Sequence, residues 1–125
     1  EMCSVRPTRT STPLQALALM NDVTFVEAAR ALAQRVMHAE AAPEARIRHA
    51  FRLVLAREPK TAELGLLLAH WQDQLARFRA DPATAAKLVS TGESPRDEKL
   101  DAAAHAAFTA VCSLLLNLDE TITRP

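Results

Sequence analysis

Two kinds of side chain in this sequence could do chemistry, the histidines and the cysteines. The four histidines are His38, His49, His70 and His105. No two of them stand one helical turn apart, which is the spacing that brings two imidazoles onto one metal ion, and no His-Glu-x-x-His motif occurs. We therefore predict structural histidines, on the surface or partly buried, and no metal site.

The two cysteines, Cys3 and Cys112, do not identify a site either. Neither belongs to the Cys-x-x-Cys-His motif that attaches haem, and the sequence has no glycine-rich loop for phosphate. The two thiols could pair, but their spacing does not decide this, so the redox compartment stays open. No motif points to a Ser/His/Asp or Cys/His nucleophile. We predict no catalytic residue and no bound cofactor in this chain.

The arginines leave three interpretations open. Fifteen basic and fifteen acidic residues cancel, so the charge balance does not favour a nucleic acid or an anionic membrane. The basic residues of interest are Arg6 and Arg9, then Arg46, Arg48, Arg52 and Arg57. We interpret them as solvated, or as neighbours of carboxylates within the fold. The alternatives are a nucleic-acid reader, or the wall of an enzyme site in which Arg9, Arg52 or Arg57 binds an anionic group.

These side chains must be positioned by helices. Only two glycines and no tyrosine occur in 125 residues, 49% of which are hydrophobic, a composition that favours helix over strand. The first expected helix follows Thr12, which with Gln15 forms a capping box, with Pro13 at the first helical position. Its apolar residues surround the helix, as in a buried one. We expect this segment, Thr12 to Asp22, to be the central element around which the other helices pack.

Five further helices are expected, over residues 23–39, 43–56, 61–80, 82–90 and 98–117. In the first of these, Glu27, Arg30 and Gln34 occupy another face than the apolar stripe. In the second, Arg46, Arg48, His49 and Arg52 form an outward basic face. Thr61 is the expected N-cap of the third, and Gly65 is expected to allow close packing of a neighbour. Gly92 should stop the fourth helix, and residues 91–97 should form an exposed loop.

The predicted fold class is all-α, a compact multi-helix orthogonal or irregular bundle of about six helices. We predict a polar opening segment or linker over residues 1–11, a single helical domain over 12–118 and a tail over 119–125. No run approaches the roughly 20 apolar residues of a membrane span, and no signal sequence is visible. The abrupt start at Glu1 looks like a cut from a longer polypeptide.

Several segments together carry a resemblance to a known family. They are Thr-Pro-Leu-Gln-Ala-Leu at 12–17, Asn-Asp at 21–22, Arg-Glu-Pro-Lys-Thr-Ala-Glu-Leu at 57–64 and Leu-Leu-Asn-Leu at 115–118. Over nearly its whole length the chain resembles the C-terminal region of the planctomycete-type domain of unknown function 1553. That domain is found in large exported proteins, often behind a cytochrome-c-like module and a second uncharacterised domain. Phe108 departs from the family pattern, which has tryptophan there in many relatives.

The resemblance implies a setting. The chain would be part of a periplasmic, cell-envelope or secreted bacterial protein, with any haem carried by another domain. The family has no assigned catalytic residues, so none is carried over. We therefore expect a non-catalytic scaffold or interaction domain whose partners are the upstream domains of the same polypeptide, with no nucleic acid and no membrane span. Its oligomeric state stays open.

Overall fold

The computed structural model describes the backbone of residues 22–123 and the side chains of residues 22–119. This part of the chain forms five helices and no strands: α3 (Val23–Ala39), α4 (Pro43–Leu55), α5 (Thr61–Ala80), α6 (Pro82–Val89) and α7 (Ala102–Thr123). The all-α prediction is confirmed. The helix expected over residues 12–21 lies outside the described residues, so its central position stays a prediction.

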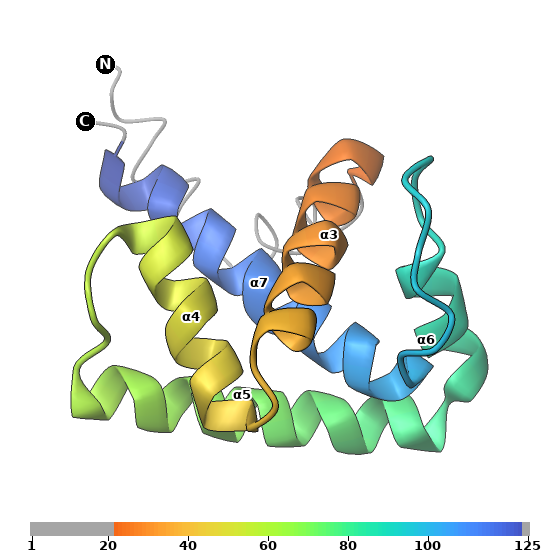
Figure 1. Cartoon of the computed structure of the whole chain (residues 1–125), viewed down its shortest axis with the longest axis horizontal. Coiled ribbons are helices and arrows are strands. Elements are labelled where there is room, and N and C mark those ends of the chain that lie inside the picture. Colours follow the sequence, from red (N-terminus) through yellow and green to blue (C-terminus); the bar gives the residue numbers. More distant parts are fainter. Residues whose placement is uncertain (1–21, 124–125) are drawn as a thin grey trace.

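Within the described residues, α7 holds the central position. It packs against each of the other four helices and crosses the middle of the molecule in Figure 1, with α5 running along one long edge. Its side chains are buried almost continuously from His105 to Ser113. A helix surrounded on most sides must be apolar around most of its circumference, as the many alanines of α7 allow.

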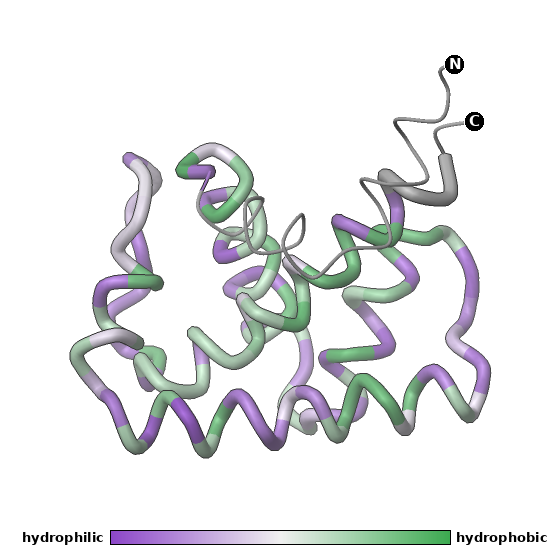
Figure 2. Tube along the Cα trace, turned by 180° about the vertical axis from the view of Figure 1, so that it is seen from behind, coloured by the Kyte–Doolittle hydropathy of each residue, from purple (hydrophilic) through white to green (hydrophobic). Residues whose placement is uncertain are grey.

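α7 is also long and apolar enough to span a membrane by length and composition alone. The stretch Ala102–Asp119 has a mean hydropathy of 1.3. However, 56% of this stretch is buried inside the fold, which is the environment of a core helix. By contrast, hydrophilic and hydrophobic residues alternate along α5 in Figure 2, as expected for a helix with one face in water.

The limits of α3 and α4 follow the local capping signals. The Asp22 side chain accepts a hydrogen bond of 2.9 Å from the Phe25 amide, which satisfies one of the free donors at the start of α3. Pro43 stands at the start of α4, where a missing N–H costs nothing. α4 ends at Leu55, and the residue after it, the C-cap Ala56, has a left-handed φ of 59°. The predicted start of each helix is therefore confirmed.

Two expectations for α5 were wrong. Thr61 is the first helical residue and the N-cap is Lys60, whose amide donates 2.8 Å to the Glu63 carboxylate. The acidic side chain at the third helical position therefore closes this end without a threonine cap. Gly65 is exposed, and a Cβ added to it would meet no atom within 4 Å. It is therefore not a close-packing position.

The start of α7 also differs from the expected limit near Glu98. The Asp101 side chain accepts 2.9 Å from the Ala104 amide, so Asp101 caps the helix and the chain before it is not helical. The helix continues to Thr123, past the expected end at Asn117. Aspartate is a preferred N-cap residue and glutamate is not, so the sequence held a signal for this start that the expected limit did not use.

Removing this cap should weaken the fold measurably. We expect Asp101→Ala to lower the free energy of unfolding by about 1 kcal/mol, because the Ala104 amide loses its acceptor. Asp101→Asn retains an acceptor oxygen and should cost much less. Urea unfolding followed by circular dichroism compares the two variants, and equal losses would show that the cap hydrogen bond is not the cause.

Candidate functional site

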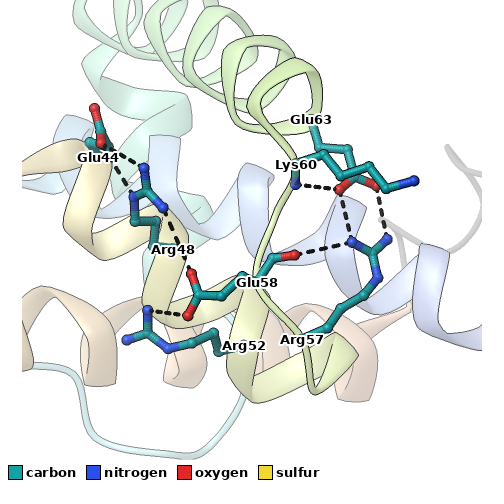
Figure 3. A network of polar contacts seen from close by, with 7 residues as sticks. All are labelled: Glu44, Arg48, Arg52, Arg57, Glu58, Lys60 and Glu63. Carbon is teal, nitrogen blue, oxygen red and sulfur yellow. Dashed lines mark hydrogen bonds and ion pairs between the residues drawn. The ribbon is translucent and has the colours of Figure 1, made fainter.

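The exposed arginines of α4 and of the α4–α5 connection are paired with carboxylates (Figure 3). Arg48 bonds to Glu44 at 3.2 Å and lies 3.7 Å from Glu58. Arg52 donates 3.2 Å to the other oxygen of Glu58. These contacts confirm the interpretation of the basic stretch as intramolecular neighbours. The pairs are half-exposed, so each adds little to stability.

Arg57 makes the most directional pair of this network. Two of its nitrogens donate to the two oxygens of Glu63, each at 2.9 Å, and the guanidinium lies 4.9 Å from the centre of the Phe51 ring. The hydrogen bonds from Arg57 lower the pKa of Glu63 to about 2. Because Glu63 also closes the start of α5, this pair fixes the connection between α4 and α5.

Arg46 does not belong to the outward basic face on which it was expected. Its Nε donates 2.7 Å to the Glu40 carbonyl and a second nitrogen donates 3.2 Å to the Met37 carbonyl. Its guanidinium lies 5.5 Å from the centre of the Phe108 ring, and burial lowers its pKa. Both carbonyls belong to the end of α3, where carbonyls have no partner within the helix. Arg46 thus caps α3 from α4.

A second polar network joins α3 to the segment 91–97. We call the four α3 side chains in it the α3 clamp: Glu27, Arg30, Gln34 and His38. Their spacing of three, four and four residues places them on one face of the helix. The structure corrects the expectation that Arg30 is exposed, because its exposed fraction is only 1%.

Every member of the α3 clamp contacts the segment 91–97. Arg30 donates 2.7 Å to the Thr91 carbonyl and 2.5 Å to the Ser94 carbonyl. Glu27 accepts 2.7 Å from the Ser94 amide and also accepts from the Ser94 hydroxyl, and these hydrogen bonds lower the pKa of Glu27. The segment is a loop with residues 93–95 exposed, as expected, and it is in addition fastened to α3.

The other half of the clamp holds the end of this segment. The Asp97 amide donates 2.9 Å to the Gln34 side chain, and His38 Nε2 lies 2.8 Å from the Asp97 carboxylate. Gly92 fits this arrangement, because its φ is +93° and an added Cβ would come within 2.5 Å of Glu27. A side chain at position 92 would therefore displace both the backbone and the clamp.

The histidines have structural surroundings of different kinds. His38 belongs to the clamp, and His49 Nδ1 lies 3.3 Å from a Glu40 oxygen. Burial lowers the pKa of His70. His105 is fully buried, and its Nε2 lies 2.9 Å from the Arg30 carbonyl, while Nδ1 has no partner. The expectation of surface or partly buried histidines was therefore wrong for His105.

His105 should make the stability of the fold depend on pH. Burial lowers its pKa below the ordinary 6.5, and the charges of Arg96, Arg30 and His38 act in the same direction. The unfolded chain then binds more protons than the folded one as pH falls through about 6.5. The stability present at neutral pH should therefore decrease on acidification, with a slope of at most about 1.4 kcal/mol per pH unit from this residue.

Urea unfolding at pH 7.5 and pH 5.5 measures this dependence. We expect the free energy of unfolding to decrease less between pH 7.5 and pH 5.5 in His105→Gln than in the unsubstituted chain. This comparison does not depend on how stable the variant is at pH 7.5. A smaller slope should remain, because the pKa of His70 is lowered by the same cause. Arg35→Gln, which changes an exposed side chain of α3, is the control. An unchanged slope in His105→Gln would contradict the assignment.

Cys112 is enclosed in the core and has no disulfide partner among the described residues. Burial in apolar surroundings raises the pKa of its thiol far above the ordinary range. A thiol that stays protonated is a poor nucleophile, so Cys112 acts as a small core residue. Cys3, Arg6 and Arg9 lie outside the described residues.

No group of three or more potential metal ligands occurs among the described residues. The two networks differ in character. The α4–α5 network is an exposed set of ion pairs. The α3 clamp combines hydrogen bonds to backbone with the side-chain contacts of Ser94 and Asp97. Helical spacing indicated that Glu27, Arg30 and Gln34 share a face. Nothing in the sequence indicated that the segment 91–97 would cover it.

A family model described as a protein of unknown function, DUF1553 (PSD1), matches residues 1–71. The match ends within α5, so the Leu-Leu-Asn-Leu segment at 115–118 lies beyond it. No curated protein and no solved structure matches the chain.

Proposed function

The chain belongs to the DUF1553 family of proteins of unknown function, and on this premise we propose that it is a non-catalytic helical scaffold at the C-terminal end of a larger exported bacterial protein. Its role would be to pack against upstream domains of the same polypeptide and hold them in place. The fold supplies a rigid unit for this purpose, with α7 enclosed by four other helices.

One observation carries the proposal. The arginines that could have served a site are used to hold helices and loops together. Arg30 and Arg46 donate to backbone carbonyls, and Arg57 makes a forked pair with Glu63. A side chain whose donors are already occupied must lose those bonds before it can bind a ligand. This pattern favours a structural role for the network.

Export and the partners within the polypeptide rest on the resemblance of the sequence to the planctomycete-type domain. Contact with upstream domains would use surfaces that remain open in the described part, such as Leu66 on α5, which is 73% exposed. The expected apolar helix over residues 12–21 would be a second contact. Fractionation of cells that express the parent protein tests the location, and recovery in the cytoplasm would contradict export.

Deletion of residues 1–125 from the parent protein tests the scaffold role. We expect the remaining domains to unfold at a lower temperature and to be cleaved faster by protease. Arg35→Ala in the parent is the matched control, because it changes only an exposed side chain of α3. A parent that keeps its full stability and activity without these residues would refute the proposal.

The alternative function is a wall of an enzyme site formed with upstream domains, for polysaccharide or redox chemistry. It is favoured by the partial exposure of Arg52 and Arg57, whose side chains are 42% and 43% accessible. Under this alternative, alanine at Arg9, Arg52 and Arg57 would lower the activity of the parent even at temperatures at which the variant stays folded. Under the scaffold proposal, these substitutions leave activity unchanged.

A further inference from the structure

A hollow of about 440 Å³ opens beside the end of α6. It is lined by Ser90, Ser94, Arg96 and Glu98, so all of its lining side chains are polar or charged. Its volume lies in the range of small-molecule sites and is too small for a folded partner. The hollow is separate from the α4–α5 network, since α4 and α6 lie on opposite sides of α3 in Figure 1.

Arg96 is the unusual member of this lining. Its Nε is buried and has no hydrogen-bond partner, and its one hydrogen bond is a long contact of 3.4 Å to the Leu100 carbonyl. The other two arginines with buried donors, Arg30 and Arg46, each reach two carbonyls. The buried Nε cannot itself meet a solute, but Arg96 forms no ion pair with any described residue, so the outer nitrogens of its guanidinium keep donors for an acceptor that enters the hollow.

The α3 clamp holds the hollow in shape. Three of the four lining residues belong to the segment 94–98, whose backbone is fastened at Ser94 by Glu27 and Arg30 and at Asp97 by Gln34. A ligand that enters would therefore not have to order this segment, which removes a large part of the usual entropic cost of binding at a loop.

The remaining lining groups indicate which polar groups a ligand needs besides its anionic group. The Ser90 hydroxyl donates to the Ala86 carbonyl and the Ser94 hydroxyl donates to Glu27, so both oxygens offer lone pairs to a ligand. Glu98 adds a carboxylate, which accepts hydrogen bonds and repels a second negative charge. The lining thus calls for one anionic group beside several hydroxyl or amino donors.

We propose that this hollow binds a small polyhydroxy carboxylate, with the carboxylate on Arg96 and the ligand hydroxyls on Ser90, Ser94 and Glu98. Arg96 supplies the planar fork that matches a carboxylate. The negative charge of Glu98 should weaken the binding of an inorganic dianion more than the binding of a ligand with a single carboxylate. This binding proposal does not depend on the scaffold role, because a domain that packs against its neighbours does not need a ligand site.

Titration of the 125-residue chain, followed by ¹H–¹⁵N NMR, tests the proposal with D-glucuronate as the probe. We expect saturable shifts confined to residues near 90–98. D-glucose, which lacks the carboxylate, and inorganic phosphate, which lacks the hydroxyl array, should each bind at least about tenfold more weakly. Phosphate that binds as tightly as D-glucuronate would overturn the ligand class, and the absence of saturable shifts near the hollow would overturn the site.

Two substitutions test whether D-glucuronate binding depends on the Arg96 side chain. Arg96→Gln removes the charge and should weaken D-glucuronate binding at least about tenfold. Arg96→Lys keeps the positive charge but removes the planar guanidinium, so it should also weaken D-glucuronate binding. It replaces Arg96→Gln in the test if the glutamine variant does not fold. Arg35→Gln removes one positive charge from an exposed position of α3 and is the matched control. Equal weakening in Arg35→Gln, or none in the Arg96 variants, would overturn the assignment.

Discussion

Arg30→Ala is expected to lower the free energy of unfolding by about 3 kcal/mol, an unusually large effect for a charged residue. The guanidinium is buried and donates to the carbonyls of Thr91 and Ser94. Alanine would leave both carbonyls without these donors and leave a space where the side chain stood. The nearby carboxylate of Glu27 would also lose a neighbouring positive charge.

Urea unfolding of Arg30→Ala beside Arg35→Ala measures the effect. Arg35 stands on the same helix but is exposed, so its substitution should change stability by no more than about 0.5 kcal/mol. Hydrogen exchange gives a second readout, because the amides of Ser94 and Asp97 should exchange faster in Arg30→Ala. Equal stability in the two variants would mean that the clamp does not support the fold.

Phe108→Ala should be at least as damaging, at about 3 to 5 kcal/mol. Phe108 is 1% exposed and its ring centre lies 5.5 Å from that of Trp71. It also supports the guanidinium of Arg46. The substitution would therefore leave a cavity where α7 meets α5. It would also remove the ring against which Arg46, the residue that caps α3, packs.

Thermal unfolding monitored by circular dichroism and by Trp71 fluorescence measures this loss. Leu66→Ala removes a large apolar side chain that is 73% exposed, so it should shift stability by no more than about 0.5 kcal/mol. A loss below about 1 kcal/mol in Phe108→Ala would contradict the packing described at α7.

The sequence predicted the existence and approximate positions of the described helices, but not the contacts between their polar faces. Asp22 and Pro43 are local signals, so the starts of α3 and α4 could be predicted correctly. The burial of Arg30 could not, because its acceptors lie 61 and 64 residues away in the chain. Periodicity indicates which side chains share a face, but it does not indicate which segment covers that face.

The candidate hollow was beyond prediction for the same reason. Ser90, Ser94, Arg96 and Glu98 form no known motif, and the position of Arg96 depends on how Glu27 and Gln34 hold the neighbouring backbone. By contrast, the pairing of Arg57 with Glu63 joins residues only six positions apart. Local charge patterning was enough to predict intramolecular pairing of that kind.

The central place of α7 has a consequence for how the protein is made. Ribosomes synthesise α3 to α6 before α7, and the surface that each of them turns toward α7 lacks this contact until α7 emerges. A nascent chain stalled before Ala102 would present these apolar faces to chaperones and proteases. Productive folding should therefore begin late, as a single step after translation of α7, and not helix by helix.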